Sequence, residues 1–319
     1  MPTPDQLFLG IDGGGTRTRA VIVNEQGRIL GSGEGGSSNY DDVGADGAAQ
    51  SISAAVNAAR SDVLLIETPF TAAFLGMAGV VSEKDRLVIR TIARDLNLAP
   101  DPFIGIDHDC RIALAGGLSG RPGIVQIAGT GSATYGRTAT GRSHRAGGWG
   151  YLLGDEGGSY WLGLQAMIAS VRMFDGRDPF TSLAERILVS LGLVDLDDIM
   201  HCLYVDSLSR TEVAALAPLV IEAAAEGDRK AQALIEQGCH DLAECVGAVA
   251  HELEMDLVGV EVALVGGLFT AGDVFRRPFT EAVNCVLPEC KLMTAELSPV
   301  LGACILALAS AGIEGIVPH

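Results

Sequence analysis

The chain has 319 residues, of which 22 are Lys or Arg and 40 are Asp or Glu, so its formal net charge is −18. At roughly 150 residues per domain, this length predicts about two domains with full hydrophobic cores. An acidic chain without a cluster of basic residues repels phosphate backbones, which argues against nucleic acid as a partner.

The first part of the chain alternates between predicted strands and predicted helices. Its apolar periodicity predicts, in chain order, strands over 6–11, 20–23 and 28–30, a helix over 46–60, a strand over 71–78, a helix over 82–97, a strand over 102–106 and a helix over 110–115. Ser82 is a suitable N-cap for the second of these helices. This alternation is typical of an α/β fold.

The same layout starts again at Gly123. The segment IVQIAGTGSATYGR repeats the order of apolar strand, glycine-rich turn and second strand seen in LGIDGGGTRTRAVIV. Beyond it, we expect helices over 160–174, 180–191, 211–226 and 228–254, a strand over 260–265 and a closing helix over 299–311. The weak internal repeat predicts two related domains, one over residues 1–116 and one over residues 117–319.

The sequence predicts neither a secretory signal nor a membrane span. No basic segment followed by an apolar stretch opens the chain, and no apolar run reaches the ~18 residues that a membrane span needs. The 7 cysteines include no C-x-x-C pair, which favours reduced thiols over disulfides or a zinc site. We therefore expect a cytoplasmic protein that does not bind membranes.

Two glycine-rich turns are the candidate phosphate-binding sites. Glycine has no Cβ, so backbone N–H groups in such turns can approach an anion closely. The first turn consists of Asp12, Gly13, Gly14, Gly15 and Thr16, and the second of Gly129, Thr130, Gly131 and Ser132. Either turn alone is equally consistent with a tight hairpin. Together they predict a polyphosphate site, with Asp12 suited to hold Mg²⁺ through water.

Two other phosphate-binding motifs fail on this sequence. The lysines, Lys84, Lys230 and Lys291, follow no G-x-x-x-x-G-K-[ST] pattern, so a Walker A loop is excluded. A G-x-G-x-x-G string occurs over 31–36, but SSNYDD follows it instead of the start of a helix. The dinucleotide-binding interpretation therefore fails its context test.

Several motifs together resemble a known family. LGIDGGGTRT, SSNY, the segment around Asp107, IAGTGS, GGWGYLLGDEGGSYWLG and ALVGGLF resemble the N-acetylglucosamine kinase branch of the BadF/BadG/BcrA/BcrD ATPase family. The resemblance implies two ribonuclease-H-like, actin-like ATPase domains that close over a central cleft, with ATP between them. It implies that the two glycine turns bind the phosphates and that Gly266 and Gly267 approach the adenosine.

The resemblance also implies the residues that act on a sugar. Asp107 matches the family's catalytic base, with Asp109 as a nearby rival, and one aligned carboxylate with Mg²⁺ suffices for phosphoryl transfer. The matched sugar-binding residues are Asn39, Asp107, Gly148, Trp149, Gly150 and Asp155.

Each of three site residues has an alternative explanation. Asp107 is also a candidate N-cap for the helix over 110–115. Asp155 is equally suited to the acidic start of a helix. Trp149 could instead be a core aromatic residue.

The expected activity is an ATP-dependent hexosamine kinase that makes N-acetylglucosamine 6-phosphate, with ATP and Mg²⁺ as cofactors. A glucosamine kinase shares most of these motifs and is the main alternative. An ATPase activator of a radical enzyme would need cysteine ligands for an iron–sulfur cluster, and the second turn has none. A non-catalytic sugar sensor would not need Asp12, Asp107 and both turns. The apolar helices of the second half are compatible with a homodimer.

Overall fold

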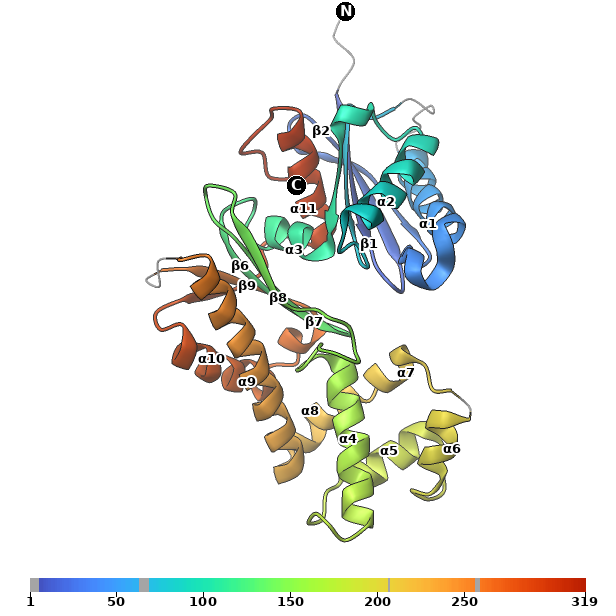
Figure 1. The fold of residues 1–319 in the computed structure, drawn as a ribbon, viewed down its shortest axis with the longest axis vertical. Helices are drawn as coiled ribbons and strands as arrows, with labels where there is room; N and C mark the ends of the chain where they lie inside the picture. The colour runs from blue at the N-terminus through green and yellow to red at the C-terminus, as the bar shows by residue number, and fades with distance from the viewer. Residues whose placement is uncertain (1–5, 63–68, 206, 256–258) are drawn as a thin grey trace, which may run out of the picture. The chain divides into compact units, whose positions relative to one another are not determined.

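The computed structural model describes residues 6–62, 69–205, 207–255 and 259–319 (Figure 1). Contacts divide the chain into two compact units. Unit 1 comprises Met1–Pro122 and Thr294–His319, and unit 2 comprises Gly123–Met293. Each unit contains a five-stranded sheet covered by helices, which confirms the α/β class.

Unit 1 is built around a mixed sheet with the strand order β3-β2-β1-β4-β5. The first three strands pair in antiparallel fashion, while β4 is parallel to β1 and to β5. Its elements are β1 (Leu7–Gly13), β2 (Thr18–Asn24), β3 (Ile29–Gly35), α1 (Tyr40–Asp62), β4 (Ala72–Met77), α2 (Glu83–Asp95), η1 (Asp101–Phe103), β5 (Ile104–His108), α3 (Asp109–Gly117) and α11 (Pro299–Ser310).

The central strand β1 buries side chains on both faces of this sheet. Leu9 and Ile11 belong to a core shared with α1 and α2, whereas Phe8 belongs to a core shared with α11. Successive side chains of a strand point to opposite faces, so one apolar strand can serve two layers of helices. This arrangement fixes the end of β1, and with it Asp12, at the middle of the sheet.

Gly31, Gly33 and Gly35 of the 31–36 string lie in β3 and not at the start of a helix. A Cβ added at Gly31 or Gly33 would lie 2.2 Å from the backbone carbonyl oxygen of Ala59 or Ala55, respectively. Alternate glycines on β3 therefore allow the backbone of α1 to rest directly on the strand. The glycines that resemble a dinucleotide-binding motif thus serve the packing of α1 on β3.

The last helix, α11, lies outside the domain in which the sequence repeat places it. The expected second domain covers 117–319, whereas α11 packs on β1 and α3 within unit 1. A Cβ at Gly10 would lie 2.6 Å from the Sγ atom of Cys304, and one at Gly302 would lie 2.1 Å from the carbonyl oxygen of Ile112. These glycines show that the closing helix is fitted to the first sheet, so the expected boundary needs this correction.

Unit 2 repeats the sheet of unit 1 and adds more helices. Its strand order is β10-β9-β6-β7-β8, with β6, β7 and β8 antiparallel and β9 parallel to β6. Its elements are β6 (Gly123–Ala128), β7 (Ser132–Arg137), β8 (Ser143–Gly147), α4 (Ser159–Phe174), α5 (Leu183–Leu191), α6 (Asp198–Tyr204), α7 (Arg210–Ala214), α8 (Ala217–Ala225), α9 (Arg229–Glu252), β9 (Glu261–Val265), η2 (Gly267–Thr270), α10 (Asp273–Val286) and β10 (Lys291–Thr294).

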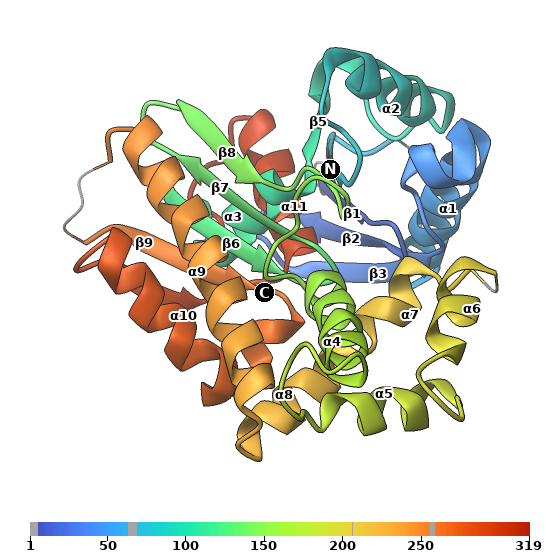
Figure 2. The ribbon, with the colours of Figure 1, turned by 60° about the horizontal axis from the view of Figure 1, so that its bottom comes forward.

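The helices of unit 2 differ in part from the sequence expectation. Helices α9 and α10 lie side by side, and α9 also packs on strands β6, β7 and β8 (Figure 2). The helix expected over 211–226 is two helices, because Pro218 at the start of α8 favours a new helix over continuation of α7. Helices α6 and α10 and strands β8 and β10 are not among the predicted elements. Within the described ranges, no helix has the length and apolarity needed to cross a membrane.

Candidate active site

The first glycine turn connects β1 to β2, and backbone hydrogen bonds from other parts of unit 1 fix its carbonyl groups. The Gly14 N–H donates to the carbonyl oxygen of Arg17 at 3.0 Å, which closes the turn. The Ser38 N–H donates to the Gly14 carbonyl at 3.1 Å, and the Ala78 N–H donates to the Gly13 carbonyl at 2.7 Å. Both carbonyls are therefore turned toward the protein. Gly15 and Thr16 are exposed at the tip of the turn, where a phosphate can reach them.

Asp12 precedes this turn and has an unusual charge environment. Burial, together with repulsion from Asp109, raises its pKa to about 6, although Arg19 and Arg17 act in the opposite direction. A partly buried carboxylate that a second carboxylate repels gains from a cation. The residues present therefore fit the expected role of Asp12 in holding Mg²⁺ through water.

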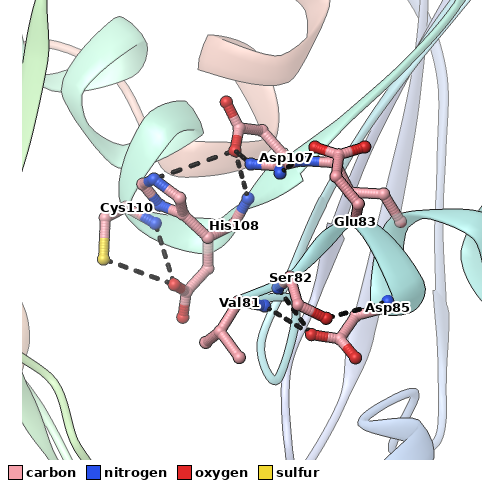
Figure 3. Close-up of polar contacts among 9 residues, drawn as sticks. Val81, Ser82, Glu83, Asp85, Asp107, His108 and Cys110 are labelled. Carbon is pink, nitrogen blue, oxygen red and sulfur yellow. Dashed lines mark hydrogen bonds and ion pairs between the residues drawn. The ribbon is translucent and has the colours of Figure 1, made fainter.

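Asp107 lies at the carboxyl end of β5, where it is tied down by two donors (Figure 3). Its Oδ1 atom accepts from the His108 N–H at 2.9 Å and from Nη2 of Arg86 at 3.0 Å. Glu83 binds the same arginine at 2.7 Å from Oε1 to Nη1. Helix α3 begins one residue after His108, its N-cap, so Asp107 does not cap that helix.

The sheet register relates Asp12 to Asp107. Asp12 pairs with Gly76 on β4, and Gly76 pairs with Asp107 on β5. With strands about 4.8 Å apart, the two aspartates are about 10 Å apart along one row of the sheet. Residues in one row of a parallel sheet share a face, so both carboxylates project from the same side. A cation held near Asp12 and a group that reacts at Asp107 would therefore lie close together.

Asn39 presents an unusual polar group. Its Nδ2 atom donates to Oδ2 of Asp42 at 2.7 Å, which fixes the orientation of the amide. Its Oδ1 atom is buried and has no hydrogen-bond partner among the described residues. Gly79 has a φ of 83°, and a Cβ there would lie 2.4 Å from that oxygen. An unsatisfied buried acceptor is costly, so this oxygen is suited to a donor from a ligand.

The residue after Asn39 anchors this segment to the start of α2. The Tyr40 hydroxyl donates to Oδ1 of Asp85 at 2.5 Å, and Asp85 also accepts from the N–H groups of Val81 and Ser82. These hydrogen bonds hold the pKa of Asp85 well below its usual range and raise the pKa of Tyr40 to about 12. The tyrosine hydroxyl is therefore committed to the protein.

The second glycine turn connects β6 to β7 and is bound to the start of α4. The Gly129 carbonyl accepts from the Ser159 N–H at 2.8 Å, and the Thr130 carbonyl accepts from the Tyr160 N–H at 3.0 Å. The Ser132 hydroxyl donates to the Glu156 carbonyl at 2.7 Å. A hydroxyl has one proton to donate, so Ser132 supports the turn in this arrangement while exposed Thr130 remains accessible to a phosphate.

Asp155 packs directly against this second turn. It is 4% exposed, and a Cβ on Gly131 would lie 2.3 Å from its Oδ2 atom. Desolvation raises the pKa of Asp155, and the charge of Arg210, 3.1 Å away, partly offsets that rise. Its φ of 61° is left-handed, a conformation that is strained for a residue other than glycine and that often occurs at functional sites. Asp155 precedes Gly158, the N-cap of α4, by three residues and so lies outside that helix.

The segment between β8 and Asp155 is open to solvent. Trp149 is 68% exposed, which contradicts the core-aromatic alternative. The guanidinium of Arg145 lies 5.4 Å from its ring centroid. Gly148 and Gly150 have φ values of 69° and 83°, so both positions need the freedom of glycine. This geometry leaves the indole available to a ligand.

The VGGLF motif reaches the second turn from β9. Gly266 has a φ of 114°, and a Cβ there would lie 2.2 Å from the carbonyl oxygen of Ala128, directly before the turn. Gly267 begins η2 and has open space on its Cβ side. Gly266 is thus adjacent to the candidate phosphate turn.

The expected site residues form two groups, one in each unit. Unit 1 holds Asp12, the first glycine turn, Asn39 and Asp107, and unit 2 holds the second glycine turn, Gly148 to Asp155, Gly266 and Gly267. Sequence reasoning missed Gly79, Arg86 and Arg210, which contact these residues from distant parts of the chain. Two cavities, of about 430 and 680 Å³, lie elsewhere in unit 2, and none of the expected residues lines them.

Three residues beside Asp107 have side chains that could together bind a metal ion. The side chains of His108, Asp109 and Cys110 lie within metal-ligand distance of one another. Asp109 Oδ1 already accepts from the N–H and Sγ of Cys110. These contacts satisfy one oxygen of the Asp109 carboxylate locally, and no second observation among the described residues points to a metal there.

The repeated sheet with a glycine-rich turn between its first two strands defines the class of actin-like ATPase and sugar kinase folds. The chain matches the BadF/BadG/BcrA/BcrD ATPase family over residues 9–307 and therefore belongs to it.

Relatives of known name cover almost the whole chain. It is 30% identical, over 95% of its length and 98% of the relative, to an N-acetylmuramic acid/N-acetylglucosamine kinase of Clostridium acetobutylicum. It is also 30% identical, over 96% of its length and 98% of the relative, to an N-acetyl-D-glucosamine kinase of Dictyostelium discoideum. A solved structure from Chromobacterium violaceum that is assigned to the N-acetylglucosamine kinases has a TM-score of 0.74 at 28% identity, and the match covers 95% of this chain and 99% of that one.

Proposed function

We propose that the chain is an ATP-dependent hexosamine kinase that converts N-acetylglucosamine and ATP to N-acetylglucosamine 6-phosphate and ADP in the cytoplasm. The observation that carries this proposal is the position of Asp107, a partly exposed carboxylate at a strand end, in one row with Asp12 beside the first glycine turn. The names of the relatives from Clostridium and Dictyostelium support the substrate class.

Asp107 acts as the general base in this proposal. Because Arg86 and the His108 N–H hold Oδ1, the carboxylate keeps one orientation and its other oxygen can accept the proton of the 6-hydroxyl. The deprotonating hydroxyl then attacks the γ-phosphorus, and ADP leaves. Phosphoryl transfer depends mainly on alignment and on charge stabilisation, so a well-oriented carboxylate meets the chemical need.

Asn39 and Asp155 bind the sugar in this proposal. Asn39 offers an acceptor without a partner, and Asp155 offers a buried carboxylate; both suit sugar hydroxyls. The exposed ring of Trp149, with Gly148 and Gly150, provides an apolar face for the pyranose ring.

The two glycine turns hold the phosphates of ATP. Exposed Thr16 and Thr130 supply hydroxyl donors beside the glycine N–H groups, whereas Ser132 keeps the second turn in shape. Gly266 packs closely on the backbone directly before the second turn, and Gly267, which has open space on its Cβ side, leaves room for the adenosine. When bound with ATP, Mg²⁺ supplies positive charge that stabilises the transferring phosphoryl group, and Asp12 would hold its water ligands.

Glucosamine is the second candidate substrate. It differs from N-acetylglucosamine only at the 2-amino group, and the Tyr40 hydroxyl beside Asn39 is bound to Asp85 and cannot bind an acetyl oxygen. No other described contact of Asn39 or Asp155 distinguishes the two sugars.

The test is ADP release from Mg-ATP by the purified protein, with N-acetylglucosamine, glucosamine, N-acetylmannosamine, glucose or no sugar. We expect strong stimulation by N-acetylglucosamine, and phosphorus–proton NMR of the product should place the phosphate on C6. A rate that no sugar changes would overturn the kinase proposal, and stimulation by glucosamine alone would favour the second candidate.

A further inference from the structure

Arg210 is the first residue of the short helix α7, far in sequence from both glycine turns. Ser209 caps this helix: its hydroxyl accepts from the Glu212 N–H, and the Glu212 carboxylate accepts from the Ser209 N–H. This capping box fixes the backbone from which the arginine side chain extends. The Arg210 guanidinium therefore extends toward Asp155 from a backbone position that the capping box fixes.

The end of this side chain lies at the second glycine turn. Nη2 of Arg210 is 3.1 Å from Oδ2 of Asp155, and a Cβ built on Gly131 would lie 3.1 Å from the same nitrogen. The guanidinium carbon also lies 5.5 Å from the ring centroid of Tyr151. A carboxylate, a glycine of the turn and an aromatic ring thus surround one side of a single arginine.

The other side of Arg210 is accessible. Its side chain is 44% exposed, whereas that of Asp155 is 6% exposed. Among the described residues, its guanidinium donates a hydrogen bond to Asp155 alone, although a guanidinium has five N–H donors. Most of its hydrogen-bonding capacity therefore faces away from Asp155.

The charge balance makes this cation unusual. The second turn, residues 129–132, contains no Lys or Arg, and the whole chain carries a net charge of −18. A nucleotide polyphosphate in such a chain needs local positive charge. The planar guanidinium donates two parallel hydrogen bonds to phosphate, a geometry that lysine does not offer.

We propose that Arg210 binds the β- and γ-phosphates of the nucleotide at the second glycine turn while it keeps its ion pair with Asp155. This inference rests on the proposed kinase function and adds to it a phosphate-binding cation from the helical part of unit 2. Because Asp155 is also the candidate sugar carboxylate, one arginine then contacts both substrate-binding groups. An arginine in this position stabilises the charge that develops on the transferring phosphoryl group.

The test is calorimetric titration of the full chain with AMP, ADP and ATP in the presence of Mg²⁺ and without sugar. For Arg210→Gln, we expect the affinity for ADP and ATP to fall at least about tenfold while the affinity for AMP is unchanged. Arg210→Lys should bind ADP and ATP more tightly than Arg210→Gln but less tightly than the wild type, because lysine keeps the charge but cannot donate two parallel hydrogen bonds to phosphate. Arg172→Gln is the matched control, since Arg172 is 40% exposed and is paired with Asp178 in the same unit.

Two further results separate the proposal from other roles of Arg210. Asp155→Asn should keep its affinity for ADP, because the arginine remains, while the KM for sugar rises. Arg210→Gln that binds ADP and ATP as the wild type does, with only a raised sugar KM, would overturn the proposal and assign the arginine to Asp155 alone. A wild-type chain that binds no adenine nucleotide would overturn the proposed function itself.

Discussion

The two glycine turns occupy equivalent places in the two sheets, but they are built differently. Each joins the first two antiparallel strands of its unit. In unit 1, a Cβ at Gly14 or Gly15 would come no closer than 3.3 Å to another atom, and the tip is open. In unit 2, Gly131 is packed under buried Asp155, and Gly158 packs on Gly131. Gly13 at the end of β1 is packed on Met77 and Ser38, and Gly129 is open, so the difference lies in the glycines that follow: Gly14 and Gly15 are open, whereas Gly131 is packed. On these glycines, the turn of unit 1 is called the open turn and that of unit 2 the packed turn.

This difference indicates how the two turns contribute. An open turn can adjust its N–H groups around a phosphate when one arrives, and the positive charge beside it would come from Mg²⁺ whose water ligands Asp12 would hold. A packed turn has its geometry fixed before any ligand binds, and its neighbours Asp155 and Arg210 link the phosphate position to the sugar position. A change at the packed turn should therefore affect stability and both substrates, and a change at the open turn should be milder.

The largest effect that would test this difference comes from a single methyl group. Gly131→Ala should lower the free energy of unfolding by about 2–4 kcal/mol, because its Cβ would displace the buried carboxylate of Asp155 and strain the ion pair with Arg210. Gly14→Ala should cost less than about 1 kcal/mol, since its Cβ would only approach the Arg17 carbonyl at 3.3 Å. Chemical denaturation of both variants makes the comparison. Equal losses would show that the turns do not differ in packing.

A smaller effect concerns the unpartnered oxygen in unit 1. Asn39→Ala should raise the KM for sugar about tenfold or more and leave the affinity for ADP unchanged, because the Oδ1 atom would no longer accept from a sugar hydroxyl. Asn57→Ala on the exposed face of α1 is a control of the same residue type. Steady-state kinetics with varied sugar provides the measurement, and an unchanged KM would remove Asn39 from the sugar site.

The smallest effect concerns the charge beside the open turn. Folding raises the pKa of Asp12 from 3.8 to about 6, so the ionised carboxylate lowers stability above pH 6, and this cost disappears below pH 3.8. Asp12→Asn should therefore stabilise the nucleotide-free protein by about 1–2 kcal/mol at pH 8 and by less at pH 5. It should also reduce the thermal stabilisation that Mg-ATP gives.

The control for this pH effect is Asp46→Asn, an exposed aspartate on α1. The difference in the free energy of unfolding between Asp46→Asn and the wild type should be small at both pH 5 and pH 8. A stabilisation by Asp12→Asn that grows as the pH falls would contradict the assigned charge environment.

Much of the fold follows from local sequence patterns. The strand and helix periodicities predict the core elements of both sheets, and the repeated glycine turn predicts their duplication. The return of α11 to the first sheet has no local signal, because it depends on glycines such as Gly10 and Gly302 that match surfaces distant in sequence. The break between α7 and α8 has a signal in Pro218, which an apolar periodicity alone passes over.

The candidate site divides in the same way. The glycine turns, Asp12 and Asp107 lie at predicted strand ends, so the sequence places them where strands of a sheet end. Arg86 and Arg210 reach Asp107 and Asp155 only through tertiary packing, and the spacing of 21 and 55 residues carries no pattern. Gly79 had a detectable signal, since a glycine after a strand often marks a positive φ, but its contact with Asn39 is tertiary.

The most direct measurement is the turnover of Asp107→Asn with Mg-ATP and N-acetylglucosamine, together with its affinity for ADP and a parallel Asp109→Asn variant. The account predicts that kcat of Asp107→Asn falls by about 10²-fold or more while ADP binds as before, because the substitution removes the base but leaves Asp12 and both glycine turns unchanged. Asp109→Asn should lose much less. Wild-type turnover by Asp107→Asn, or a larger loss in Asp109→Asn, would contradict the assignment of Asp107 as the base.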